Sequence, residues 1–293
     1  MKLPAAGYRD YSSALLLEQG SNISLWSSSP SGVYANGLGF TSTNVYPATT
    51  SSRAYGMAVR CMKPLDACSA STPCGTACTF GGLLYDSVTV GTQCWMDRNL
   101  GATQVATSSL DYLSYGSLYQ WGRATDGHQL ITCTGPYTAD CSAVNGTTIT
   151  NSNDPANALF ITESNTPWDW RVDQDGTLWN SPGYVNNPCP SGWHVPSGGT
   201  TGEWDTAMDT LSLTTCSSDC LNAVANSTLK LPAAGYRYSR FETLYVQGTY
   251  GYYWTSTPTV TINSFDSYIN STGVHPSHWD ERAFGLSVRC LKD

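Results

Sequence analysis

Two histidines, His275 and His278, stand three residues apart at a spacing that could grip zinc. Without further ligands beside them, the pair is a weak signal for a zinc site. Nucleophilic catalysis would need a Cys or Ser beside a His that a third group orients. Of the four histidines, His194 lies in a Gly-Trp-His-Val-Pro motif, where we expect it to be partly buried and hydrogen-bonded to backbone. The acidic residues show no spacing typical of a catalytic pair.

A second group of oxygen ligands lies at Asp173, Asp175 and Gly176, which resemble the middle of a calcium loop. Arg171 and Pro182 stand at the first and last positions of that loop, so an EF-hand is excluded. We therefore expect an Asx turn here rather than a metal site.

The segment between Gly248 and Arg282 is rich in aromatic and amide side chains of the kind used in adaptable binding surfaces. We expect it to form loops that bind a carbohydrate or a protein. The candidate ligand-binding residues are Tyr250, Tyr252, Tyr253, Asn263, Phe265, Asp266, Tyr268, Asn270, His275, His278, Trp279 and Asp280.

The composition limits the kind of protein that carries this surface. The 293 residues include 14 Lys and Arg against 22 Asp and Glu, a formal net charge of −8. Nucleic acid is not an expected partner, because phosphate binding needs clustered cations. No stretch approaches the ~18 apolar residues of a membrane span. Eleven cysteines favour an oxidising compartment, so we expect a secreted or cell-surface protein, and their odd number leaves at least one thiol without a partner in the chain.

An internal repeat organises the chain. Three matched pairs carry it: residues 2–9 with 230–237, 26–30 with 254–258, and 59–61 with 288–290. The stretches between these framework positions differ almost completely, as in a scaffold with variable loops. We expect residues 1–63 to be the C-terminal half of a preceding repeat module, and residues 64–293 to be a complete module.

Local patterns place a few elements on this scaffold. Apolar and polar residues alternate over 84–91, which predicts a strand, and residues 202–211 have the apolar spacing of a helix. The Gly-, Asn-, Thr- and Pro-rich segment 132–187 predicts long ordered loops. So many turn residues exclude a helical bundle, and the lack of alternating helices excludes a parallel α/β sheet.

Several motifs of the complete module resemble those of a known family. They are GTQCWM-x-x-NL at 91–100, YG-x-LYQW at 115–121, PCPSGWHVP at 188–196, EW at 203–204, LPAAGYR at 231–237, WTS at 254–256 and VRC at 288–290. In this order they resemble the Fibrobacter succinogenes major paralogous domain. The resemblance implies a bacterial exported domain, often carried in several copies, with no established activity. It also implies an α+β, C-type-lectin-like fold: a small twisted antiparallel sheet, one or two helices, and long disulfide-tied loops.

The same resemblance implies a disulfide that ties the helical region to the last strand, between Cys189 and Cys290. Cys61 is the counterpart of Cys290 in the repeat, so we expect it to be unpaired or to pair with another chain. Cys133 with Cys141, and Cys216 with Cys220, are plausible short bridges. The sequence leaves four cysteines without an assigned pairing: Cys68, Cys74, Cys78 and Cys94.

Two chemistries known in lectin-like domains can be compared with this chain. Calcium sites there use Glu/Asn pairs and Trp-Asn-Asp motifs, and Trp279-Asp280-Glu281 is the nearest match, so calcium is a weak expectation and no other cofactor is implied. Formylglycine-generating oxidases use a redox cysteine pair, for which Cys216 and Cys220 are the candidates. A structural bridge is the better interpretation of that pair.

These observations favour a non-catalytic extracellular binding or adhesion module. An alternative is a subunit of a surface assembly or filament, in which residues 1–63 complete a neighbouring subunit. That alternative follows because about 60 residues bury too little surface to be comfortable alone. A formylglycine-generating type of enzyme is a third, weaker hypothesis.

Overall fold

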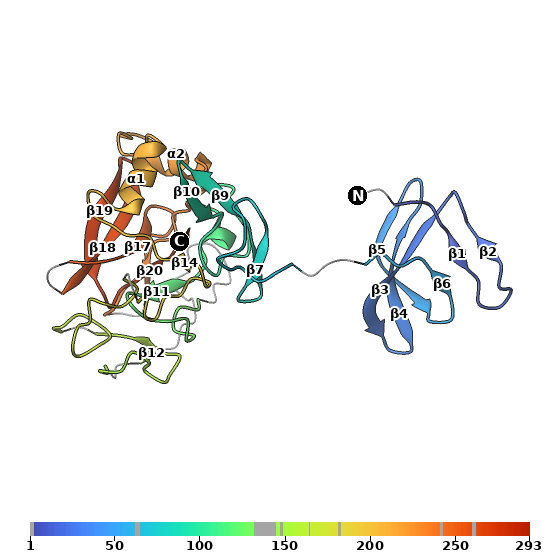
Figure 1. Ribbon diagram of the computed structural model, residues 1–293, viewed down its shortest axis with the longest axis horizontal. Helices are drawn as coiled ribbons and strands as arrows, with labels where there is room; N and C mark the ends of the chain where they lie inside the picture. Colours follow the sequence, from blue (N-terminus) through green and yellow to red (C-terminus); the bar gives the residue numbers. More distant parts are fainter. Residues whose placement is uncertain are drawn as a thin grey trace. The chain divides into compact units, whose positions relative to one another are not determined.

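A computed structural model describes residues 3–61, 65–131, 145–146, 149–163, 165–180, 183–240, 243–259 and 262–293. The chain divides into two compact units, Met1–Pro64 and Leu65–Asp293 (Figure 1). The division falls one residue after the boundary between the two expected modules.

The first unit consists of short antiparallel strands. They are β1 (Tyr8–Arg9), β2 (Leu16–Leu17), β3 (Ile23–Ser31), β4 (Tyr34–Phe40), β5 (Val45–Ser52) and β6 (Gly56–Met57). The strands pair in the orders β2-β1-β6 and β3-β4-β5, so the second group is a simple meander.

The second unit begins with hairpins and loops and ends with a large sheet. Its strands are β7 (Cys78–Phe80), β8 (Leu83–Tyr85), β9 (Ser87–Val90), β10 (Gln93–Met96), β11 (Leu118–Gln120), β12 (Asn145–Gly146), β13 (Phe160–Ile161), β14 (Trp193–His194), β15 (Tyr236–Arg237), β16 (Leu244–Tyr245), β17 (Gly251–Pro258), β18 (Asn263–Asn270), β19 (Gly273–Glu281), β20 (Gly285–Ser287) and β21 (Leu291–Lys292). Its helices are the 3-10 turn η1 (Tyr112–Ser114), α1 (Glu203–Thr210) and α2 (Cys220–Asn226).

The strands of the second unit form two main sheets. The larger has the order β16-β15-β20-β17-β18-β19, with β11 also paired to β20, and the smaller has the order β14-β21-β10-β9. The meander β17–β19 is antiparallel, whereas β17 and β20 run parallel. β19 is the edge strand, so one side of the meander has no strand beside it among the described residues.

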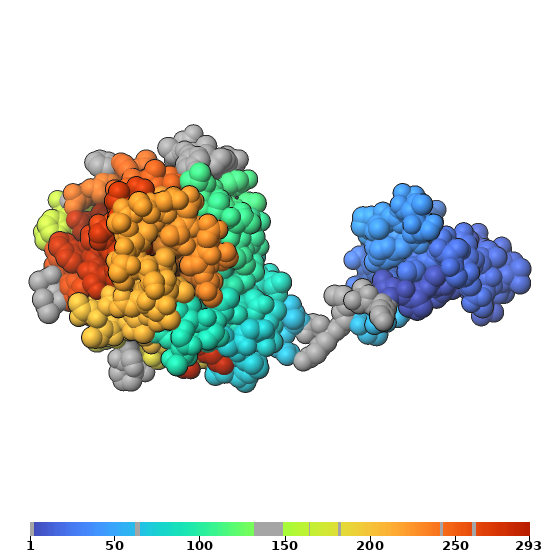
Figure 2. Space-filling model, turned by 90° about the horizontal axis from the view of Figure 1, so that it is seen from above, coloured from blue at the N-terminus to red at the C-terminus, as the bar shows by residue number. Residues whose placement is uncertain are grey.

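Helix α1 forms where the sequence predicts it. Glu203 and Asp205 lie in its first turn, where negative charge interacts favourably with the helix dipole. Trp204, Ala207 and Met208 face inward and are buried, as their spacing indicates. They pack with Trp95, Tyr253, Ile269 and other apolar side chains in a core between the helices, β9–β10 and the meander. Figure 2 shows this helical segment in orange, between the red strands and the teal hairpin.

A second core lies around buried tryptophans from the loops, including Trp121, Trp170 and Trp179. Trp254 joins this core, and its indole N–H donates a hydrogen bond to the carbonyl oxygen of Tyr119 at 2.7 Å. The described part of the segment 132–187 therefore consists largely of loops anchored by large rings, and residues 132–144, 147–148, 164 and 181–182 lie outside the described residues.

The two units repeat one arrangement of strands. In the first, β3 and β4 pair Ile23 with Phe40 and Trp26 with Gly37, and β17 and β18 repeat these pairs as Gly251 with Ile269 and Trp254 with Asp266. The irregularity after Trp26 recurs after Trp254, and the one between Gly37 and Gly39 recurs between Asp266 and Tyr268. The first unit therefore has the same fold as the C-terminal half of the second.

The glycine of the repeated motif has a structural reason to be the same in both units. Gly7 and Gly235 both have positive φ, and a Cβ there would collide with the carbonyl oxygen of Leu17 or Tyr245 on the neighbouring strand. Only glycine allows this close approach in the KLPAAGYR motif.

The expected α+β, C-type-lectin-like fold is wrong. The chain is mostly β, with 35% of residues in strands and 7% in helices. The turn-rich sequence forms many short hairpins, and the helical signal at 202–211 gives only an eight-residue helix. The prediction that residues 250–281 form loops is also wrong, because most of them lie on the strands β17, β18 and β19.

Four disulfides link described residues, and all lie in the second unit. They are Cys68–Cys78, Cys74–Cys94, Cys189–Cys290 and Cys216–Cys220. Cys61 is free and exposed. Cys133 and Cys141, for which we expect a bridge, lie outside the described residues.

Candidate binding surface

The meander β17–β19 places aromatic side chains from three strands next to one another. Tyr252 on β17 is paired with Tyr268 on β18, which is paired with His275 on β19. Directly paired residues of neighbouring antiparallel strands point to the same face of a sheet. The three rings therefore lie side by side on one face.

Tyr268 is the centre of this group. Its ring centroid lies 5.7 Å from that of Tyr252, 6.2 Å from Tyr250, 4.3 Å from His275 and 4.7 Å from His278. Stacked and edge-on contacts of this kind hold aromatic rings in fixed orientations.

The contacts continue across the sheet to residues that sequence reasoning did not select. The ring of Tyr236 lies 5.2 Å from Tyr252, 5.7 Å from Tyr245 and 5.5 Å from Phe284. We call Tyr236, Tyr245, Tyr250, Tyr252 and Tyr268 the tyrosine array. Tyr236 lies in the repeated segment 230–237, so its position in the sequence indicates a framework role.

Three titratable groups lie beside the array. The Nδ1 atom of His278 is 2.8 Å from Oδ1 of Asp266 and 3.9 Å from Oδ2 of Asp280. Asp266 is completely buried, and its other carboxylate oxygen has no hydrogen-bond partner among the described residues. We call Asp266, His278 and Asp280 the acid–histidine cluster.

Burial and neighbouring charges shift the pKa values of this cluster. Burial raises the pKa of Asp266, although its hydrogen bond with His278 opposes the shift. Burial and then the charge of Asp266 raise the pKa of Asp280 to about 8. Burial alone would lower the pKa of His278, but the hydrogen bond and charge of Asp266 raise it above the ordinary value. At neutral pH the cluster therefore retains protons and can both donate and accept hydrogen bonds.

The cluster also contains the types of ligand that a cation needs. One ligand atom from each of its three residues lies within 4.8 Å of the others. One imidazole and two carboxylates suit a transition metal better than calcium, which prefers six to eight oxygens. The zinc pair suggested by spacing is only half present, because His275 stacks on Tyr268 and is not part of this group.

The Trp279-Asp280-Glu281 motif does not form the suggested calcium site. Asp280 faces the cluster, while the carboxylate of Glu281 accepts a hydrogen bond from Arg240 at 2.7 Å. Trp279 is 55% exposed and is paired in register with Phe265. Successive side chains of a strand alternate between faces, so the three residues do not converge on one point.

An open pocket of about 500 Å³ lies beside the edge strand β19. Tyr268, His275 and His278 line it on the strand side, and Asp205 and Asp209 of α1 line it on the helix side. A ligand in this pocket would meet aromatic rings and carboxylates together.

Five of the twelve candidate residues do not belong to this surface, and one of them is Trp279, which pairs with Phe265 and so lies on the face opposite His278 and Asp280. Tyr253 is fully buried against the helices, and its hydroxyl donates to the carbonyl oxygen of Pro232 at 2.6 Å. Asn270 accepts a hydrogen bond from the amide of Thr272 and so shapes a turn. Asn263 and Phe265 are half-buried at the other end of β18.

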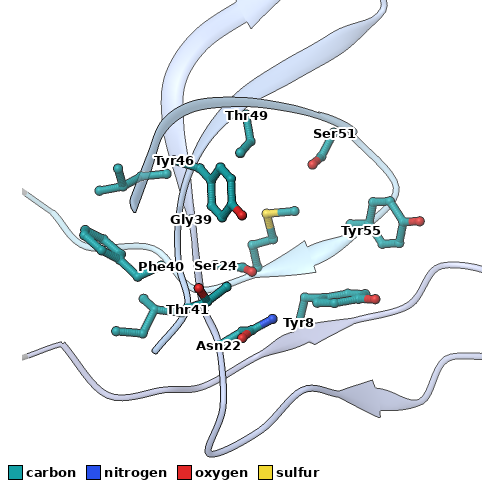
Figure 3. Close-up of a pocket in the computed structure, with 13 residues that line it drawn as sticks. Tyr8, Asn22, Ser24, Gly39, Phe40, Thr41, Tyr46, Thr49, Ser51 and Tyr55 are labelled. Atoms are coloured by element: carbon teal, nitrogen blue, oxygen red, sulfur yellow. The ribbon is translucent and has the colours of Figure 1, made fainter. Parts of the chain in front are cut away.

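The corresponding face of the first unit is hollow. A pocket of about 310 Å³ opens there, and Figure 3 shows its lining from Tyr8 and Tyr55 to Tyr46 and Thr49. By strand register, Asn22, Ser24, Gly39, Tyr46, Thr49 and Ser51 stand in the places of Tyr250, Tyr252, Tyr268, His275, His278 and Asp280. The same scaffold thus presents a cavity in one unit and a filled, charged surface in the other.

His194 has a different environment from the one expected. Its two ring nitrogens contact carboxylates rather than backbone, with Nδ1 2.6 Å from Asp293 and Nε2 3.1 Å from Glu203. Burial alone would lower the pKa of His194, but these contacts raise it. His194 therefore connects Asp293 to Glu203 at the start of α1.

Two further predictions concern metal and redox chemistry. Asp175 accepts hydrogen bonds from the amide and hydroxyl of Thr177, which is the expected Asx turn. Cys216 and Cys220 form a disulfide, and Cys220 is the first residue of α2.

Comparison with known families adds an identification to this geometry. A family model described as the Fibrobacter succinogenes major domain matches residues 88–292. The chain belongs to this family. The Fibrobacter succinogenes major domain thus covers β10, both helices and the entire meander that carries the tyrosine array. No curated protein and no solved structure matches the chain.

Proposed function

We propose that this chain is a non-catalytic extracellular binding protein, and that its second unit holds its ligand on the face with the tyrosine array and the acid–histidine cluster. The difference between the two units carries the proposal. Their strands agree in register, yet the residues at equivalent places on this face differ in size and charge. A scaffold kept constant under a varied surface is typical of recognition.

The acid–histidine cluster supports the same conclusion. Placing two carboxylates beside each other away from water costs stability, because burial disfavours ionisation of both and the charge of Asp266 further disfavours ionisation of Asp280. Thr49 and Ser51 stand at two of these places in the first unit, so the fold itself does not require the charges. Groups that cost stability and have shifted pKa values gather at functional sites.

A carbohydrate is the ligand class that fits these groups best. Carboxylates and imidazole can bind the neighbouring hydroxyls of a sugar, and tyrosine rings offer flat apolar faces with a polar edge. The pocket beside β19 combines both kinds of group within about 500 Å³.

The disulfides are compatible with a secreted or surface location. None of the helices in the described ranges has the length and apolar character needed to cross a membrane.

Binding of the labelled full chain to a printed oligosaccharide array tests the proposal. Bound sugars should be lost on Tyr268→Ser and kept on Tyr112→Ser, which removes an exposed tyrosine far from the meander in the sequence. Equal binding by both variants would overturn the assignment of the face. Binding only to immobilised proteins, again lost on Tyr268→Ser, would keep the face and replace the ligand class.

A further inference from the structure

The first unit exposes side chains whose counterparts are buried in the second. Val59 is 69% exposed, whereas Val288 is fully buried. Val45 is 61% exposed, and its counterpart Val274 is 6% exposed in the core beneath the helices. Apolar side chains that are exposed here but buried at the equivalent places of the second unit indicate surface that another segment can cover.

The covering material in the second unit is its front half, residues 65–229. Trp254 makes two hydrogen bonds to this front half. Its indole N–H donates to the carbonyl oxygen of Tyr119, and its carbonyl oxygen accepts from the indole N–H of Trp204. Its counterpart Trp26 is only half-buried. One face of the first unit therefore lacks the packing that the second unit has.

A strand edge is also open at the same place. In the second unit β20 pairs with β11 of the front half, matching Leu118 with Ser287 and Tyr119 with Leu286. The counterpart strand β6 is paired with β1 and with no other named strand of the described residues. Unpaired edges bind further strands readily.

The last residues of the repeat show the same difference. Arg289 is fully buried and donates hydrogen bonds to Asn99, Met96 and Leu229, all from the front half. Cys290, also fully buried, is bridged to Cys189. Their counterparts Arg60 and Cys61 are both exposed.

We propose that the open face of residues 3–61 binds a separate front-half segment of this family, one that resembles residues 65–229 and is not already covered by a C-terminal half. The segment adds a strand to β6, buries Trp26 and Val59, and bridges its counterpart of Cys189 to Cys61. In that bridge two thiols lose two protons and two electrons, which reduce a small-molecule disulfide to two thiols.

The proposal selects this occupant over a second folded copy of the chain. In such a copy, residues 65–229 already cover residues 230–293, and the Cys189–Cys290 disulfide holds them together. The open face needs a strand for β6, an acceptor for the Trp26 indole, and a cysteine for Cys61. A front half supplies all three, because it does so in the second unit.

The test uses an extended chain, made by fusing a second copy of residues 65–229 directly ahead of residue 2 of the full chain. Residue 2 is the repeat counterpart of residue 230, so the added front half is followed by residues 2–61 just as residues 65–229 are followed by residues 230–293. In the presence of oxidised glutathione, peptide mapping should find Cys61 joined to the added counterpart of Cys189. Alkylation of Cys61 by iodoacetamide should slow at least tenfold, and hydrogen exchange at residues 57–61 should slow as well.

A matched substitution separates specific docking from general shielding. Val59→Asp should leave the melting temperature of the original chain unchanged, since Val59 is exposed there. The second measurement uses an extended chain in which the added counterpart of Cys189 is replaced by Ser, so that no disulfide can form with Cys61. In that chain Val59→Asp should restore fast alkylation of Cys61. Alkylation of Cys61 in the extended chain at the original rate would overturn the proposal. Aggregation of the extended chain would also overturn the proposal, provided that a control fusion of two copies of residues 65–293 folds under the same conditions.

Discussion

Replacement of Arg289 by methionine should destabilise the second unit strongly. Its guanidinium is fully buried, which lowers its pKa to about 10, and lies 2.8 Å from Asn99 Oδ1, 3.1 Å from the Met96 carbonyl oxygen and 2.6 Å from the Leu229 carbonyl oxygen. Methionine retains much of the side-chain volume but donates to none of these acceptors. Each buried acceptor left without a partner costs about 1–3 kcal/mol.

The net effect is smaller than the sum of these losses, because the variant no longer buries a charge. We therefore take the lower end of that range, about 1 kcal/mol for each of the three acceptors, and expect a loss of roughly 3 kcal/mol in the free energy of unfolding. For a unit of this size that corresponds to a fall in melting temperature of roughly 6–12 °C.

Differential scanning calorimetry of the full chain can measure this change, and Arg60→Met is the matched control. Arg60 occupies the same place in the repeat but is exposed, so its replacement should leave the thermogram unchanged. A shift below 2 °C for Arg289→Met, or equal shifts for both variants, would refute the view that the front half anchors the last strand through this guanidinium.

Three further predictions concern charge and cross-linking. The raised pKa of His194 means that its two carboxylate contacts stabilise the fold fully below the unfolded pKa of about 6.5 and are lost as pH rises through the folded value. His194→Gln should therefore reduce the fall in melting temperature between pH 6 and pH 9. Asp280→Asn should raise the melting temperature more at pH 9 than at pH 5, because ionised Asp280 opposes Asp266 only above its pKa of about 8. Cys189→Ser opens a bridge between residues 101 apart and should cost roughly 4–5 kcal/mol by urea unfolding, clearly more than Cys216→Ser, whose bridge spans four.

Local signals in the sequence predicted the elements that depend on local chemistry. The alternation at 84–91 corresponds to β8 and β9, and the spacing at 202–211 corresponds to α1. The fold class was wrong because it came from a resemblance. The strands of the meander pair with their neighbours in the sequence, but whether such segments become strands depends on packing as well as on local composition. Serine, threonine and asparagine in residues 250–281 resembled loop residues, although paired strands also accommodate them.

The candidate site was only partly predictable, because local composition identifies a segment but not the face of the sheet on which each residue lies. Composition selected the correct segment, but the face on which each residue lies depends on register, and two irregularities change the alternation within it. Tyr253 was therefore placed on the surface although it is in the core. Tyr236 contributes from another strand, and no pattern along the chain connects it with Tyr252.

Comparison of the two units separates what the fold needs from what this chain uses. Gly7 and Gly235 are the same because a neighbouring carbonyl oxygen excludes any Cβ. Gly39 and Tyr268 differ although they occupy the same place in the register, since this face tolerates either a cavity or a ring. At such a position the residue can change to suit a ligand without disturbing the fold, whereas the framework residues cannot change. The tyrosine array and the acid–histidine cluster lie largely at such positions, and binding experiments should begin there.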